Sequence, residues 1–326
     1  MAAFPQLSMP LPCYSAADPG SWDFVLDRAR LLDAAGVDRL VVSDHVVFGE
    51  RLEEYGRPEI GGQAGGVQPT GPDGHWLEPL TTLAVVAGAT RHIRLGTNIM
   101  IAALRRPAVL AKSAATLDVL SGGRLDLGVG VGWQREEYLA AGLDFDDRGA
   151  LLDDTLAVCQ TLWSQQRAEY SSPYLSFEAI HMMPKPVRPH GVPIWVSGTV
   201  NPRVVRRLAR FGVGWIPWGD AARDVAAAVV AMKDALADAG RDPAGLQVVG
   251  SLRAVRAGDG ALDLPATMAA VPELAAAGVT DFRSRISLPD DHLTASDVLP
   301  EIVAAFRAAA GRTDAVGTAL TRGESA

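Results

Sequence analysis

The chain lacks the features that define several classes of protein. Its 326 residues include only two cysteines, Cys13 and Cys159, which are too few for a disulfide framework or a cysteine metal site. No run of about 20 apolar residues is present to span a membrane. The first residues also lack the basic and apolar regions of a signal peptide. We therefore expect a protein of the reducing cytoplasm, with no membrane association.

The chain also lacks a nucleic-acid-binding pattern and two common hydrolytic motifs. Its formal net charge is -8, and no cluster of lysine and arginine is present. The motifs HExxH and GxSxG are absent, and the six histidines are scattered along the sequence. These absences disfavour a metal-dependent hydrolase and an α/β-hydrolase, and we expect no metal ion.

Three predicted helices stop at a glycine and are followed by a β-rich run. The glycines are Gly36, Gly212 and Gly278. Glycine is the residue that most often adopts the left-handed conformation that ends a helix. Because this unit recurs from one end of the chain to the other, it predicts an alternation of strands and helices.

The spacing of apolar residues predicts eight such strand–helix pairs. Strands are expected at residues 4–9, 39–44, 93–99, 124–131, 193–198, 214–218, 246–252 and 280–286. The inner faces of the first and third helices would carry Val25, Ala29, Leu32, Ala35, Leu110, Ala114 and Leu117. Eight parallel strands favour a closed (β/α)8 TIM barrel, with an open doubly wound sheet as the alternative.

Two segments interrupt this rhythm within a single barrel domain spanning residues 1–311. Residues 49–76 are rich in glycine, follow the second strand on the ligand-facing rim, and are predicted to form a lid-like loop. Residues 165–192 contain tyrosines and several prolines, and predict an ordered insertion before the fifth strand. Residues 312–326 form a polar C-terminal tail, which we expect to be frayed.

The fourth predicted strand carries glycine at alternate positions, namely Gly128, Gly130 and Gly132. Alternate residues of a strand share one face, so this face has no side chains. Such a face suits a flat ligand lying against the backbone, or a strand packed tightly against its neighbours. The next residue, Trp133, is suited to pack against a ring system at the barrel mouth.

Asn98 stands at the end of the third predicted strand. It is either a hydrogen-bond partner for the edge of a heterocycle or a turn residue.

A further set of polar residues stands at the end of the fifth predicted strand. Ser197, Gly198 and Thr199 precede a helix that begins near Asn201 and Pro202, an arrangement that predicts either a phosphate site or ordinary helix capping.

His45 follows Asp44 at the end of the second strand. A histidine there is suited to deliver a proton, and Asp44 would orient it or cap the following loop. The alternative for His45 is a core histidine bonded to the backbone.

The sequence resembles the bacterial luciferase-like monooxygenase superfamily, in particular its branch that uses the deazaflavin coenzyme F420. The resemblance covers nearly the whole chain. It rests on SDHVV at 43–47, EPLTTLAVVAGATRHIRLGTNIMI at 78–101, RRPAVLAKSAATLDVLSGGRLDLGVGVGWQREEY at 105–138, and WVSGTVNPRVVRRLARFGVGWIPW at 195–218. It implies an (α/β)8 barrel with an insertion before the later strands.

The resemblance also implies cofactor-binding roles for particular residues. Ser43, Asp44 and His45 would border the deazaflavin ring. Thr97 and Asn98 stand where the family often has a non-prolyl cis peptide, which would support one face of that ring. Those that line the ring, its tail or the substrate space would be Gly130, Gly132, Trp133 and Trp218. Those that hold the phosphate would be Ser197, Gly198 and Thr199.

Two departures from the family pattern refine this expectation. Trp133 stands where the family's sugar-phosphate dehydrogenases carry a glutamate, so that substrate is not transferred to this chain. Val131 stands where flavin-using luciferases commonly carry an arginine, which disfavours FMN.

We therefore expect an oxidoreductase that transfers a hydride between F420 and a small organic substrate, with His45 and Asp44 as catalytic residues. One alternative is an FMN-dependent monooxygenase that uses O2 and a partner reductase. The other is a non-catalytic protein that binds a deazaflavin or flavin. The family also implies a homodimer, paired through helices such as 81–90.

Overall fold

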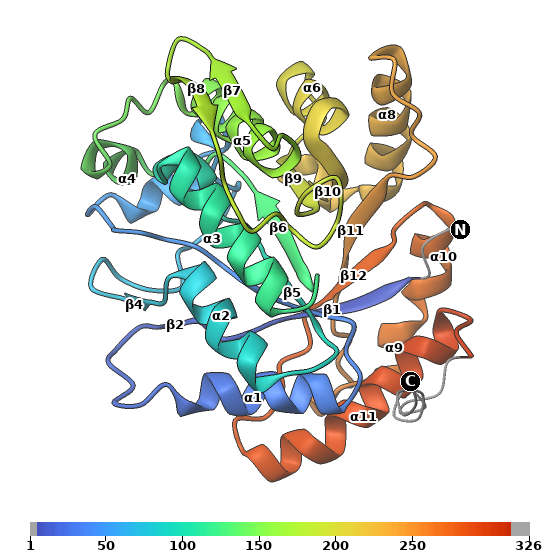
Figure 1. Cartoon of the computed structure of the whole chain (residues 1–326). Coiled ribbons are helices and arrows are strands. Elements are labelled where there is room, and N and C mark those ends of the chain that lie inside the picture. The colour runs from blue at the N-terminus through green and yellow to red at the C-terminus, as the bar shows by residue number, and fades with distance from the viewer. Residues whose placement is uncertain (1–4, 314–326) are drawn as a thin grey trace, which may run out of the picture.

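The computed structural model describes residues 5–313, and its central feature is a closed barrel of eight parallel strands (Figure 1). Around the barrel, the strands follow the order β1, β12, β11, β10, β9, β6, β5 and β3. Their bounds are β1 Gln6–Pro10, β3 Arg39–Val42, β5 Arg94–Thr97, β6 Leu125–Val129, β9 Ile194–Gly198, β10 Gly212–Pro217, β11 Gln247–Leu252 and β12 Asp281–Ser284. The predicted TIM barrel is confirmed.

The barrel closes at β1, which pairs with a strand on each side. Gln6 lies opposite Asp281 of β12, and Ser8 lies opposite Arg39 of β3. Closure leaves no strand of the ring with an unpaired edge. Each of the eight expected strands occurs, although the first was predicted to begin at Phe4, which lies outside the described residues.

Helices surround the barrel, as Figure 1 shows. The longer ones are α1 Asp23–Ala34, α2 Pro79–Ala89, α3 Pro107–Leu120, α5 Arg148–Ser164, α6 Pro202–Phe211, α8 Val225–Asp238 and α11 His292–Ala309. The shorter ones are α4 Arg135–Ala140, α7 Asp220–Arg223, α9 Leu264–Met268 and α10 Ala270–Ala276. Proline opens α2, α3 and α6, where its missing N–H removes no helical hydrogen bond. Among residues 5–313, no helix combines the length and apolarity needed to cross a membrane.

The apolar core lies between the strands and the surrounding helices. The predicted inner faces of α1 and α3 are confirmed, because the side chains expected there are buried: Val25, Ala29, Leu32, Ala35, Leu110, Ala114 and Leu117. Their alternation with exposed residues follows the helical period, so one stripe of each helix covers the barrel wall.

The two expected insertions have local structure of their own. Residues 49–76, the lid loop, contain the 3-10 helices η1 Leu52–Gly56 and η2 Pro58–Ile60. The loop ends in β4 His75–Trp76, which pairs with β2 Tyr14–Ser15. Residues 165–192 contain an antiparallel hairpin of β7 Ala168–Ser171 and β8 Ser176–Ile180. Of the expected tail, residues 314–326 lie outside the described residues.

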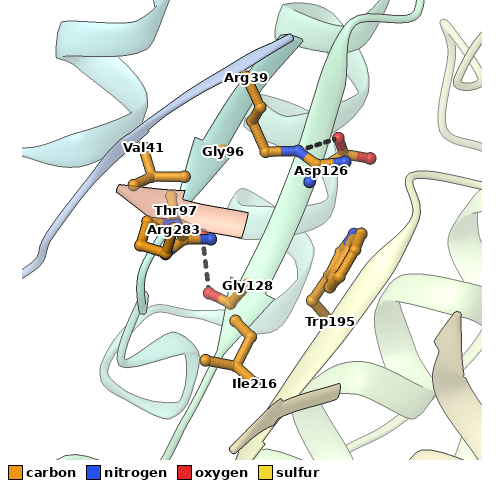
Figure 2. A pocket seen from close by; sticks show the side chains of 9 residues that line it. All are labelled: Arg39, Val41, Gly96, Thr97, Asp126, Gly128, Trp195, Ile216 and Arg283. Carbon is orange, nitrogen blue, oxygen red and sulfur yellow. Dashed lines mark hydrogen bonds and ion pairs between the residues drawn. The ribbon is translucent and has the colours of Figure 1, made fainter. Parts of the chain in front are cut away.

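The inside of the barrel holds paired charges. Arg39 of β3 is 4% exposed and is paired with Asp126 of β6, at 3.0 Å, and with Asp281 of β12. Figure 2 shows Arg39 and Asp126 facing each other across the interior. Arg94 forms a second ion pair with Asp126 at 2.6 Å. Burial alone would raise the pKa of the Asp126 carboxyl, but Arg39 and Arg94 outweigh it and hold that pKa below its usual value.

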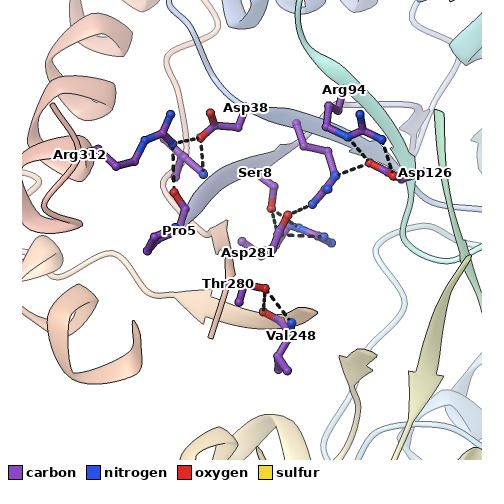
Figure 3. Close-up of polar contacts among 12 residues, drawn as sticks. Pro5, Ser8, Asp38, Arg94, Asp126, Val248, Thr280, Asp281 and Arg312 are labelled. Carbon is purple, nitrogen blue, oxygen red and sulfur yellow. Dashed lines mark hydrogen bonds and ion pairs between the residues drawn. The ribbon is translucent and has the colours of Figure 1, made fainter. Parts of the chain in front are cut away.

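Asp281 connects these ion pairs to β1. Its carboxylate accepts a hydrogen bond from Ser8 and lies 3.5 Å from the guanidinium of Arg283. Figure 3 shows the bond between Ser8 and Asp281 and the ion pair between Arg94 and Asp126. We call Ser8, Arg39, Arg94, Asp126, Asp281 and Arg283 the interior ion cluster. A buried charge is tolerated only when it is paired and hydrogen-bonded, so the cluster ties β1, β3, β5, β6 and β12 together.

We predict that Asp126→Asn lowers the free energy of unfolding by about 3–5 kcal/mol, because it leaves Arg39 and Arg94 without a shared carboxylate. Urea denaturation measures this change. The control is Asp27→Asn, which breaks the exposed 3.0 Å pair with Arg30 and should cost less than about 1 kcal/mol. Equal losses in the two variants would contradict a structural role for the cluster.

Candidate functional site

The predicted site residues stand at one end of the barrel. Asp44 and His45 follow β3, Asn98 follows β5 and Trp218 follows β10. Because all eight strands are parallel, their carboxyl ends meet at the same rim. In TIM-barrel enzymes, this rim holds the active site.

A cavity of about 90 Å³, which we call the mouth cavity, opens at this rim. Its lining includes Asn98, Ile216, Trp218, Ser251, Arg283 and Arg285. A second cavity of about 10 Å³ lies inside the barrel, lined by Arg39, Thr97, Asp126, Gly128, Trp195, Ile216 and Arg283 among others (Figure 2). Ile216 and Arg283 line both cavities, so they separate the mouth from the interior.

The glycine row that begins in β6 and continues beyond its end is filled by the chain itself. A Cβ atom added to Gly128 would lie 2.1 Å from the carbonyl oxygen of Thr97. Added to Gly130 or Gly132, it would lie 2.9 Å or 3.0 Å from the side chain of Ile99 or Ile101, respectively. The expectation of a bare face open to a ligand is therefore wrong. The glycines instead make room for residues 97–101, as the alternative interpretation of tight packing predicted.

The segment that fills this face contains an unusual peptide bond. The bond between Asn98 and Ile99 is cis, at the position where the family resemblance implies a non-prolyl cis peptide. Hydrogen bonds attach the segment to β6: Thr97 Oγ1 and Met100 N both donate to the carbonyl oxygen of Gly128, at 2.7 and 2.8 Å. The segment therefore has a fixed position beside β6 and carries Asn98 to the mouth cavity.

The lid loop contacts the rim of the barrel beside the mouth cavity. Trp218 Nε1 donates to the carbonyl oxygens of Gly61 and Gly62, both at 3.1 Å. The ring of Tyr55 lies 5.4 Å from that of Trp133 and 6.4 Å from that of Trp218. These contacts attach the loop to the barrel through an aromatic cluster and two hydrogen bonds.

His45 lies in an aromatic enclosure next to a buried carboxylate. Its ring is 4.4 Å from Phe48, 4.8 Å from Trp76 and 6.0 Å from Trp133. Its Nδ1 is 3.4 Å from Oε1 of Glu137, whose side chain is fully buried in α4. The same oxygen accepts a hydrogen bond from the backbone N–H of Val46 at 2.8 Å, so the carboxylate is held in place beside the imidazole.

Asp44 does not orient His45, contrary to one sequence-based expectation. Its carboxylate is paired with Arg105 and accepts a hydrogen bond from the N–H of Ile101 at 2.9 Å. Arg105 also reaches Glu78 at 3.0 Å. Asp44 therefore connects the rim to the segment after β5. Glu137 was missed because nothing in the sequence links residues 45 and 137, which are far apart along the chain.

The predicted phosphate residues stand beside a helix that is already capped. Asn201 Oδ1 accepts hydrogen bonds from the N–H groups of Arg203 and Val204, at 3.0 and 3.1 Å. Capping, one of the two interpretations of this segment, therefore occurs, and it uses the first free amides of α6. Thr199 Oγ1 accepts from Asn201 Nδ2 at 3.0 Å. Ser197 and Thr199 remain phosphate-site predictions on the strength of their hydroxyl groups.

Other candidate chemistries are weak in this region. Within residues 5–313, no group of three or more histidine, cysteine, aspartate or glutamate side chains is placed to hold a metal ion. Burial raises the pKa of the Cys13 thiol, with its hydrogen bonds to Ser43 only partly offsetting this. Cys13 is therefore a neutral thiol rather than an activated nucleophile.

We predict that Trp218→Phe loosens the lid loop, because it removes both hydrogen bonds from the indole to Gly61 and Gly62 and keeps an aromatic ring. Hydrogen exchange of the backbone amides in residues 57–66 should become several-fold faster. The amides of α2 in the same sample serve as the control and should be unchanged. Unaltered exchange in 57–66 would show that Trp218 does not hold the loop.

Comparison with known proteins gives one family match. A model of the luciferase-like monooxygenase family matches residues 10–270. An uncharacterized protein of Mycobacterium tuberculosis is 35% identical over 166 residues, which are 51% of this chain and 58% of that protein. A phthiodiolone/phenolphthiodiolone dimycocerosates ketoreductase of the same species is 37% identical over 171 residues, 51% of this chain and 44% of the ketoreductase. The chain thus spans about half the length of these relatives.

Solved structures share the fold at low sequence identity. An F420-dependent secondary alcohol dehydrogenase has a TM-score of 0.70 at 17% identity, with 94% of this chain and 100% of that chain covered. The long-chain alkane monooxygenase LadA has a TM-score of 0.71 at 13% identity, with 97% of each chain covered. These similarities establish a common barrel architecture.

Proposed function

Because the chain belongs to the luciferase-like monooxygenase family, we propose that it is an oxidoreductase that transfers a hydride between coenzyme F420 and a small organic substrate. The substrate would be a carbonyl compound or its alcohol, as the ketoreductase relative suggests. The observation that carries the proposal is the placement of His45 against buried Glu137, because reduction of a carbonyl needs one proton for each hydride.

The residues at the mouth fit a flat heterocycle with polar edges. Trp133 Nε1 is buried and has no hydrogen-bond partner among residues 5–313. An unpartnered buried donor costs about 1–3 kcal/mol, so a ligand or water that accepts from it is favoured. The Asn98 amide supplies a donor and an acceptor in the mouth cavity, and the Trp218 indole supplies an apolar face.

The lid loop has to move for a three-ring cofactor to enter. The mouth cavity encloses about 90 Å³, whereas sites for small molecules usually enclose about 300–1,000 Å³. Outward movement of the loop would release Gly61 and Gly62 from Trp218 and enlarge the mouth. In the proposal, Asn98, Trp133 and Trp218 hold the ring, with Ser43, Gly130 and Gly132 nearby. Ser197, Gly198 and Thr199 lie by the phosphate.

His45 would move the proton. Nδ1 lies 3.4 Å from Glu137 and forms no hydrogen bond among residues 5–313. Nε2 lies 3.4 Å from the Gln68 amide of the lid loop, so movement of the loop would free Nε2 to exchange a proton with the substrate oxygen. Phe48, Trp76 and Trp133 keep water from the imidazole. The reduced coenzyme, when bound, supplies the hydride; the chain positions the substrate and exchanges the proton.

The flavin alternative has support of its own. The family model is named for monooxygenases, and one structural neighbour is a Baeyer–Villiger monooxygenase in complex with FMN. Its TM-score is 0.57 at 17% identity, so the likeness concerns the fold. In this alternative, the same mouth would hold reduced FMN supplied by a reductase, and O2 would be consumed.

Cofactor binding separates the two proposals. We predict that F420 binds the purified protein more tightly than FMN does, because Val131, just after β6, stands where the family resemblance implies an arginine in flavin-using members. At 100 times its dissociation constant, F420 should stabilise the fold by about 2.7 kcal/mol, measured by thermal unfolding against the same concentration of FMN. Tighter FMN binding together with O2 consumption would reverse the assignment.

The role of the His45–Glu137 pair is tested by paired variants. We predict that His45→Ala lowers kcat by roughly 10²–10⁴-fold with F420 affinity little changed. Glu137→Gln keeps the acceptor for Val46 but removes the charge beside His45, and should lower kcat with KM unchanged. The control is Glu169→Gln in β7, which only breaks an exposed ion pair with Arg167. Equal kcat in the Glu169 and Glu137 variants would remove Glu137 from the mechanism.

A further inference from the structure

Arg283 is a buried cation with an unused donor. Its residue is 6% exposed, Nε donates to Ser8 Oγ at 2.8 Å, and Nη2 lies 3.5 Å from Asp281. Its Nη1 has no hydrogen-bond partner among the described residues, although it is buried. Since Arg283 lines both the mouth cavity and the interior cavity, this guanidinium forms part of the floor of the mouth.

The interior ion cluster does not neutralise Arg283. The cluster contains three guanidinium groups, on Arg39, Arg94 and Arg283, and two carboxylates, on Asp126 and Asp281. Asp281 is shared, because Arg39 pairs with it more closely than Arg283 does. Burial, and then repulsion by Arg39, lowers the pKa of Arg283 to about 9, so the group stays protonated at neutral pH. Arg283 therefore keeps a positive charge at the floor of the mouth that the shared carboxylate of Asp281 only partly offsets.

A second cation stands at the wall of the same cavity. Arg285 lines the mouth cavity two residues further along the strand end, together with Ser251 and Asn98. Gln63 of the lid loop lines the same cavity, so Arg285 also lies near the lid loop. None of the described side chains that line the mouth cavity is acidic. The cavity thus combines two guanidinium groups, the hydroxyl of Ser251 and the amides of Asn98 and Gln63.

We propose that the mouth cavity binds a carboxylate of the substrate between Arg283 Nη1 and Arg285, which makes the substrate an oxo acid or the corresponding hydroxy acid. This assignment rests on the proposed oxidoreductase function for the carbonyl, while the carboxylate is assigned from the cavity alone. Guanidinium groups suit the planar, bidentate recognition of a carboxylate. Bonding to Arg283 Nη1 also satisfies the unused buried donor.

The test measures the binding of propionate and propionamide, which match in size and differ in charge, to the full chain by calorimetry with and without F420. Propionate should bind at least about tenfold more tightly than propionamide. Arg285→Gln, at an exposed residue, should remove most of this preference. Arg253→Gln, an exposed arginine outside the cavity lining, is the control and should retain it. Arg283→Met tests the buried donor in the same way if the variant folds.

Two results would overturn the proposal. One is equal binding of propionate and propionamide to the unaltered protein. The other is an Arg285→Gln variant that loses F420 affinity but keeps the preference for propionate, since the cation would then serve the anionic tail of the cofactor. Failure of the proposed function looks different: F420 would not bind, while the preference for propionate and its dependence on Arg285 would persist.

Discussion

Paired charges buried inside the barrel fix the relative positions of its strands. Arg39 joins carboxylates of β6 and β12, strands that are not its neighbours in the sheet. Since a buried charge without a partner is costly, the strands that carry these groups must keep their positions around the ring. The same cluster leaves Arg283 incompletely paired, and this residue faces the mouth. The interior thus sets both the stability of the barrel and the charge of its open end.

The shape of the mouth follows from the missing side chains in β6 and in the residues directly after it. Gly128, Gly130 and Gly132 admit residues 97–101, and hydrogen bonds to Gly128 hold that segment against the strand. The segment carries Asn98 into the mouth cavity, and its Ile101 N–H binds Asp44 on the neighbouring rim. The lid loop then covers the opening through its bonds with Trp218. A cofactor in this family member would meet a surface built by β5 and its extension, with β6 behind it.

The sequence predicts the architecture because repetition carries that information. Eight apolar runs separated by amphipathic helices allow few folds, and the helix faces around Val25 and Leu110 follow from the helical period. The site was harder to predict. Periodicity shows that Gly130 and Gly132 share a face, but it does not show which segment fills that face. The contact of His45 with Glu137 and the unused donor of Arg283 depend on distances between distant parts of the chain. Sequence patterns relate residues that are close along the chain, so they do not predict such contacts.

The decisive measurement is a crystal structure of the protein with F420 bound. We expect a deazaflavin ring against residues 97–101, within reach of Asn98 and His45, and a lid loop lifted away from Trp218. We also expect Arg283 and Arg285 to remain free to bind a substrate carboxylate beside the ring. A ring bound outside the mouth, or an F420-loaded protein whose lid loop still bonds to Trp218 over an unchanged cavity, would contradict the account.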